Sequence, residues 1–303
     1  MTDTLSVTPV RSVAGVRGER VACGPEGRWA AAERRFVVLD GAAVLTAPRA
    51  LDGALRFSAS GDALLAGTER LELPAAVWAG LADPRPAVAG GAKDLDLTAA
   101  AWDADGEALA VAGERRPVRP AGAGASSVPG PMAWLTLLDG RTRTPCRSLW
   151  HGVADAPRHV AVEAGAIAAD ADAGACVWAG GKEFRLDVGP VIGLALGDAG
   201  RLLALVDLDG AVGVWRGPRY ARRVRVGAGA QGAIAAAAAA PVVAWARADG
   251  AAVWAGGETA VLRTPAIRAL ALNPDGTRLV ALDVASTLHE AAITISGRVS
   301  GAR

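Results

Sequence analysis

The sequence predicts an all-β protein built from one repeated unit. Three observations carry this prediction: a segment that recurs 76 residues later, a glycine turn that follows one apolar strand after another, and Asp-Gly pairs at regular places between strands. Repeats of this length are supersecondary units that bury their hydrophobic faces against neighbouring copies. We therefore expect residues 1–303 to form a single domain.

The recurring segment is Val177–Gly181, which returns as Val253–Gly257. Across the 32 positions that begin at Cys176, 12 are identical to the residue 76 positions later. A shorter relation places Asp209-Gly210 on Asp249-Gly250 at an offset of 40. The offset of 76 therefore corresponds to two units of about 38 residues.

Each unit begins with an apolar strand, and a glycine stands four residues after the last apolar residue of that strand. The glycines are Gly27, Gly61, Gly106, Gly200 and Gly276. A second apolar strand follows, as in residues 201–206 and 277–282.

An Asp-Gly pair then marks a tight hairpin, because these residues supply the positive φ angles that such turns need. The pairs begin at Asp40, Asp139, Asp209 and Asp249. A third strand carries Val-Trp, with Trp78, Trp178, Trp215 and Trp254 at one position of the unit. A weaker fourth strand completes it. We expect these tryptophans to pack between adjacent units, since large aromatic side chains dominate cores.

This pattern resembles the WD-repeat family over roughly residues 20–299. The resemblance implies a WD40-like β-propeller of four-stranded blades. Dividing the chain by the unit length gives about seven blades, and six or eight also fit the spacing. The blades would start near residues 19, 53, 93, 150, 190, 230 and 266. No Gly-His pair opens a blade and the usual Asp-His-Ser-Trp network is missing, so the resemblance is to a degenerate type. Strand-like residues 4–10 are expected to close the ring by pairing with the last blade, which removes an exposed edge.

Composition excludes several classes of protein. Hydrophobic residues make up 51% of the chain, charged residues 21%, and the formal charge is +1. A disordered chain would have fewer hydrophobic residues and a larger net charge, and a general nucleic-acid binder would have a large basic excess. Three cysteines without a CxxC motif favour a reduced cytoplasmic compartment, and we expect each to be a buried, inert thiol. The apolar run 232–246 would span about 22 Å as a helix, short of the roughly 30 Å bilayer core, so no membrane insertion is expected.

Catalytic and metal-binding signals are sparse. The chain has three histidines, and His289 begins an HExxH-like segment that lacks the second histidine. The single asparagine, Asn273, stands in a blade turn, which argues against a calcium-dependent propeller enzyme. We therefore predict no catalytic residue, no metal ligand and no cofactor.

One motif supports an alternative fold. Gly227, Gly229 and Gly232 form GxGxxG after a strand-like segment, and Asp249 follows where a dinucleotide fold places its ribose-binding acid. This alternative is an NAD(P)-binding oxidoreductase. Against it, fewer than three helical turns separate the last glycine from Pro241, and the segment also fits the repeat register.

Two basic segments are candidate contact surfaces. The third unit carries an insertion, residues 114–131, whose composition indicates a flexible loop and which contains Arg115, Arg116 and Arg119. The fifth unit carries a denser group: Arg216, Arg219, Arg222, Arg223 and Arg225. This group would suit an acidic partner or, in a second alternative, a nucleic-acid backbone.

The sequence thus favours a non-enzymatic protein-interaction scaffold in a bacterial cytoplasm. The resemblance also extends to degenerate bacterial propellers that accompany MoxR-type AAA+ ATPases and von Willebrand A proteins. It implies one of these as a protein partner.

Overall fold

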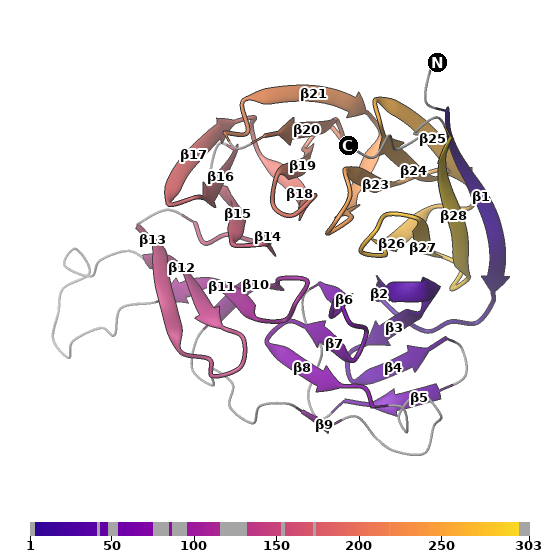
Figure 1. The fold of residues 1–303 in the computed structure, drawn as a ribbon, viewed down its shortest axis with the longest axis horizontal. Coiled ribbons are helices and arrows are strands. Elements are labelled where there is room, and N and C mark those ends of the chain that lie inside the picture. Colours follow the sequence, from indigo (N-terminus) through magenta and orange to yellow (C-terminus); the bar gives the residue numbers. More distant parts are fainter. Residues whose placement is uncertain are drawn as a thin grey trace, which may run out of the picture.

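The computed structural model describes residues 4–40, 43–47, 54–74, 85–86, 96–115, 132–152, 155–171, 174–217 and 219–296. Within these residues, 28 strands form seven four-stranded antiparallel sheets arranged around a central axis (Figure 1). The same residues contain no α-helix and one 3₁₀ turn, η1 (Pro25–Gly27). The chain is a seven-bladed β-propeller, as the repeat predicted.

The strands follow one another from the axis outwards in blades one to six. Blade one comprises β2 (Arg20–Cys23), β3 (Trp29–Glu33), β4 (Phe36–Leu39) and β5 (Ala43–Thr46); blade two, β6 (Leu55–Phe57), β7 (Ala63–Ala66), β8 (Glu69–Glu72) and β9 (Arg85–Pro86); blade three, β10 (Asp96–Trp102), β11 (Ala108–Arg115), β12 (Met132–Asp139) and β13 (Pro145–Gly152). Blade four comprises β14 (Val160–Glu163), β15 (Ala166–Ala171), β16 (Gly174–Ala179) and β17 (Lys182–Asp187); blade five, β18 (Val191–Gly197), β19 (Leu202–Asp207), β20 (Val212–Arg216) and β21 (Arg222–Gly227); blade six, β22 (Ala230–Ala236), β23 (Val242–Arg247), β24 (Gly250–Ala255) and β25 (Glu258–Arg263).

Blade seven joins the two ends of the chain. It contains β26 (Ile267–Leu272), β27 (Arg278–Asp283) and β28 (Leu288–Ser296), with β1 (Thr4–Val13) as its outer strand. The β1–β28 register runs from Thr4 opposite Ser296 to Val13 opposite Leu288. The expected closure by the N-terminal strand is confirmed, and the strand is three residues longer than predicted.

One predicted blade boundary is wrong. Blade four begins at Val160 and not near residue 150, because β13 continues to Gly152 as the outer strand of blade three. Blade three is the longest unit, so dividing the chain by an average unit length placed the boundary inside its last strand. The other six boundaries lie within three residues of the observed first strands.

The hydrophobic core lies between the blades. Seven clusters of buried side chains occupy the seven blade interfaces of the described chain. Trp178, Trp215 and Trp254 are each at most 5% exposed and each pack against the preceding blade. The predicted role of these three tryptophans is confirmed; Trp78 lies outside the described residues.

Two features of the repeated turn require glycine: its backbone conformation and its contact with the preceding blade. All five glycines adopt φ between 69° and 78°, a region that other L-residues avoid. The turn also touches the preceding blade: a Cβ on Gly200 would lie 2.6 Å from the Glu163 carbonyl oxygen, and one on Gly276 would lie 2.7 Å from Val242 Cγ2.

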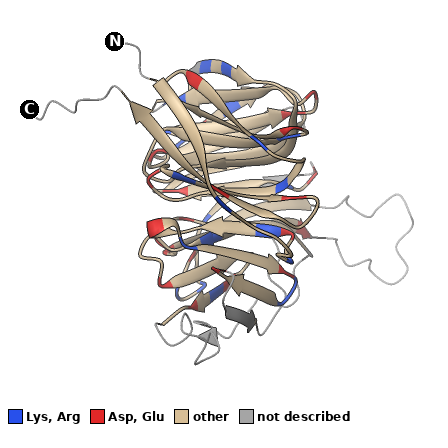
Figure 2. Ribbon diagram, turned by 90° about the vertical axis from the view of Figure 1, so that its right-hand side faces the viewer, with Lys and Arg blue, Asp and Glu red and all other residues tan. Residues whose placement is uncertain are grey.

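The ring has two faces. The turn face, toward the viewer in Figure 1, carries the turns between the first and second strands of each blade, such as residues 103–107 and 198–201. The linker face carries the hairpins between the second and third strands, such as residues 208–211 and 284–287, and the links from blade to blade. Figure 2 shows the ring edge-on, with basic and acidic residues interspersed.

Candidate functional site: the linker face and the central channel

Large hydrophobic side chains are exposed mainly on the linker face. Among the described residues, five of the seven large exposed hydrophobic side chains lie there: Phe36, Leu97, Met132, Leu208 and Val284. Leu208 is 67% exposed and Val284 is 62% exposed. These two residues are separated by the 76-residue offset, so the same hairpin position of blades five and seven presents an aliphatic side chain to solvent.

Phe36 extends this surface onto blade one. It is 59% exposed at the start of β4, where the hairpin from β3 returns. A cavity of about 460 Å³ adjoins it and is lined by Gly15, Arg17, Glu33, Arg34, Phe36 and Val38. Exposed apolar side chains gathered on one face commonly mark protein interaction sites.

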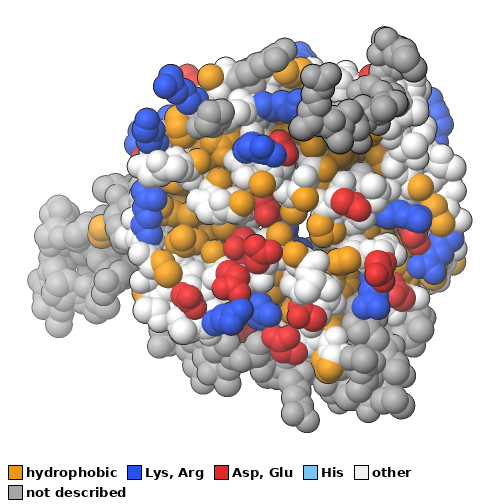
Figure 3. All heavy atoms as spheres, in the orientation of Figure 1, with side chains coloured by type: hydrophobic (Ala, Val, Ile, Leu, Met, Phe, Trp, Pro, Cys, Tyr) orange, Lys and Arg blue, Asp and Glu red, His pale blue; other side chains and the backbone are white. Residues whose placement is uncertain are grey.

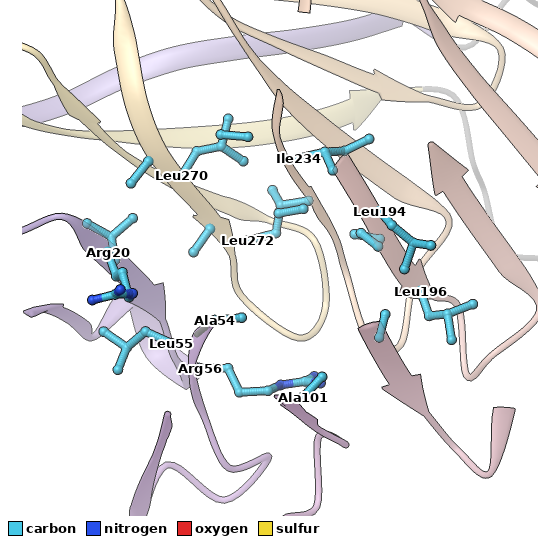
Figure 4. Close-up of a pocket in the computed structure, with 18 of the residues that line it drawn as sticks. Arg20, Ala54, Leu55, Arg56, Ala101, Leu194, Leu196, Ile234, Leu270 and Leu272 are labelled. Atoms are coloured by element: carbon cyan, nitrogen blue, oxygen red, sulfur yellow. The ribbon is translucent and has the colours of Figure 1, made fainter. Parts of the chain in front are cut away.

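A channel of about 360 Å³ runs along the axis of the ring and is lined by the first strand of every blade (Figure 4). Most of its wall is aliphatic, with Leu55, Leu194, Ile234 and Leu270 among the larger side chains. Four charged residues also line it: Glu19, Arg20, Arg56 and Arg268. Arg20 and Arg268 stand at or near the starts of β2 and β26, at the linker-face end of the channel.

Arg56 spans the other end. Its Nη1 donates to the carbonyl oxygen of Trp102 at 2.9 Å, and its Nη2 donates to Glu163 Oε2 at 3.0 Å. The Glu163 side chain is 6% exposed. Burial raises the pKa of Glu163, and the nearby Arg56 charge only partly offsets this effect.

Acidic side chains gather around the centre of the turn face (Figure 3). Asp103 is 8% exposed and accepts hydrogen bonds from the backbone N–H groups of Glu107 and Ala108. Burial raises the pKa of Asp103, as it does that of Glu163. Among the described residues, no group of three His, Cys, Asp or Glu side chains is placed to hold a metal ion.

The predicted arginine surfaces lie on different parts of the ring. Arg216 ends β20 at the turn face, with its Cζ 5.1 Å from the Trp254 ring centroid. Arg223 lies on the outer strand β21, with its Cζ 5.2 Å from the Trp215 ring centroid. Arg222 belongs to the same strand and Arg219 is exposed in the preceding loop. The structure therefore brings this group together on blade five, partly engaged in stacking.

The insertion arises from the opposite face. Arg115 is the last residue of β11, and Met132 begins β12 at the linker face. The first two residues of the predicted flexible insertion 114–131 belong to β11, and the remainder, with Arg116 and Arg119, lies outside the described residues. Of the described residues, Arg115 at the end of β11 and Arg216 at the end of β20 thus stand at opposite faces of the ring.

The dinucleotide-binding interpretation of the glycine triplet is wrong, because the glycines lie in and between strands and not before a helix. Gly227 ends β21, Gly229 lies in the link between blades, and Gly232 lies within β22. The alanine-rich segment that follows is strand up to Ala236 and a non-helical turn from 237 to 241, because its alanines pack between blades, which overrides the helix propensity of alanine. Asp249 pairs with Arg247 at 2.8 Å in a hairpin. No helix follows to receive a pyrophosphate.

The contacts of two histidines could not be found in the sequence. His159 Nδ1 lies 3.1 Å from Asp170 Oδ2 in blade four. In blade seven, His289 Nε2 lies 3.0 Å from Asp283 Oδ2, and His289 Nδ1 lies 3.0 Å from Ser12 Oγ. The second contact ties together β27, β28 and β1. Ser12 is 277 residues from His289, so local spacing gave no signal.

The expectation of three buried thiols is confirmed only for Cys23. Cys23 is buried and Cys176 is half-buried, but Cys146 is exposed on β13. As the outer strand of its blade, β13 turns alternate side chains toward solvent.

The chain matches no protein-family model and no curated protein sequence. The described part of the chain contains no helix that could span a membrane.

Proposed function

We propose that the protein is a non-enzymatic scaffold that binds a protein partner through its linker face. The observation that carries the proposal is the pair Leu208 and Val284, each more than 60% exposed at the same hairpin position of different blades. A hairpin tip accepts polar residues readily. Aliphatic side chains at equivalent hairpin tips are therefore better explained by contact with another molecule.

The architecture supports this role. The buried interfaces between blades hold the ring together, so residues exposed on the linker face are not needed for the core. Phe36 and its cavity would add an aromatic anchor on blade one, and aromatic side chains in pockets contribute strongly to interfaces. The resemblance to WD-type bacterial propellers makes a MoxR-type AAA+ ATPase or a von Willebrand A protein the first partner to test.

The test is affinity capture of such a partner by the purified propeller. We expect stoichiometric binding by the native protein, and a loss of at least tenfold in affinity for the variant Leu208→Ser/Val284→Ser. A matched control is Ile295→Ser, which changes a 38% exposed side chain at the turn-face end of β28. Equal binding by all three proteins would refute the proposal for the linker face.

A further inference from the structure

We propose that the central channel binds an aliphatic carboxylate, with the carboxylate at the linker-face end and the alkyl chain along the axis. This inference concerns a small molecule and does not depend on the protein partner proposed above. It follows from the channel's wall, its size and the placement of its arginines.

The wall is suited to an alkyl chain. Apart from Trp102 and the charged residues, its larger side chains are leucine, isoleucine and valine, contributed by the first strands of several blades. The lined segment of β26, from Arg268 to Leu272, extends over about 13 Å at the usual rise of a strand. The volume of about 360 Å³ lies within the range of small-ligand cavities, roughly 300–1,000 Å³.

The charges at the linker-face end suit an anion. Arg20 contacts only weakly the Glu19 carboxylate, at 3.8 Å, and the Glu19 side chain is 61% exposed. Arg268 donates from Nη2 to Ser286 Oγ at 3.2 Å. A guanidinium has five N–H donors, so each arginine retains donors for a carboxylate, which it binds in a bidentate manner.

The opposite end explains why the ligand would have one orientation. Arg56 is held there by Trp102 and Glu163, so its charge is already neutralised by a buried carboxylate. A ligand carboxylate at that end would face Glu163 and Asp103. The two arginines at the linker-face end are therefore the better site for the anionic group.

Calorimetric titration of the purified protein with octanoate tests the proposal. We expect saturable binding of one octanoate per chain, and at least tenfold weaker binding of octanol and of octylamine. The variants Arg20→Gln and Arg268→Gln should each weaken octanoate binding at least tenfold. The control Arg263→Gln, at a side chain 84% exposed on the outer strand of blade six, should leave it unchanged.

A second variant tests the alkyl part. Ala161→Leu adds bulk to the channel wall and should block octanoate while circular dichroism and the thermal midpoint show a folded ring. Octanol binding as tightly as octanoate, or equal losses in the Arg20 and Arg263 variants, would overturn the proposal. So would binding of a peptide with an apolar residue and a free carboxylate at its C-terminus in the absence of octanoate binding.

Discussion

The guanidinium of Arg56 on blade two reaches past the edge of blade three and donates a 3.0 Å hydrogen bond to the Glu163 carboxylate of blade four. The same side chain also binds the backbone of blade three through Trp102. One arginine thus links three successive blades at the turn-face end of the channel. Glu163 is nearly buried, which makes its charge costly wherever the pairing is incomplete.

Glu163→Gln should change how stability depends on pH. Burial raises the pKa of Glu163 in the folded state. The contribution of Glu163 to the free energy of unfolding is therefore most favourable at low pH, and is lost as the pH rises above 4.5, the ordinary pKa of a glutamate. The stability of the Glu163→Gln variant relative to the native protein should therefore increase from pH 4 to pH 7. Denaturant unfolding at several pH values measures this difference.

The control for that experiment is Glu107→Gln, which removes a 55% exposed acid on the same face. Its stability difference from the native protein should change little over this range. A relative stability of Glu163→Gln that falls with rising pH would contradict the assignment of Glu163 as a destabilised buried acid.

The closing strand β1 should stabilise the fold mainly through its buried side chain, Leu5. Leu5 on β1 is 9% exposed and packs in the interface between blades six and seven. We expect Leu5→Ala to lower the free energy of unfolding by about 2–4 kcal/mol. Val10→Ala on the same strand, at a side chain 50% exposed, should change it by less than about 0.5 kcal/mol. Similar effects at both positions would mean that β1 is not docked as described.

Replacing a repeated turn glycine by alanine should destabilise the protein more than the same change at a glycine with a similar φ angle and no neighbouring atoms. Gly200→Ala places a methyl group against the Glu163 carbonyl in a left-handed conformation, and should cost about 2–4 kcal/mol. Gly181 has almost the same φ, +76°, but a Cβ there meets nothing within 4 Å. Gly181→Ala should cost only about 1 kcal/mol, measured by the same unfolding assay. Equal costs would remove the contact with the preceding blade from the explanation.

Thiol reactivity should separate the three cysteines. Cys146 is exposed and should react rapidly with a disulfide reagent at pH 8 in the folded protein. Burial raises the pKa of Cys23 far above its ordinary value, so it should react only on unfolding. Cys176, half-buried and with a pKa also raised by burial, should react slowly. Rapid reaction of Cys23 in the folded protein would contradict its place in the interface between blades seven and one.

Much of the fold could be predicted, because the sequence repeat corresponds to the strands and turns of successive blades. Val177–Gly181 and Val253–Gly257 occupy equivalent strands, and the turn glycines mark the first hairpin of five blades. The fourth boundary failed because blade three departs from the average length. The exposure of Cys146 could not be predicted, because the local sequence does not show that its strand is the outer strand of the blade.

The candidate site was much less predictable. The channel wall consists of ordinary strand residues, so nothing in the sequence distinguishes Leu194 or Leu270 from other core leucines. Leu208 and Val284 lie in tight hairpins, where the alternation that separates buried from exposed strand positions does not apply. The arginines singled out in the sequence are on blade five and at the insertion. Arg20 and Arg268 belong to neither group, and nothing in their local sequence indicates that they line a channel.

We propose that the linker face carries the partner-binding surface. Hydrogen exchange of the complex with the captured partner, compared with the free propeller, tests it most directly. We expect slower exchange in the hairpins 208–211 and 284–287 and in residues 33–36, with turns 103–107 and 198–201 unchanged. Protection confined to the turn face or to β21 would contradict the proposal.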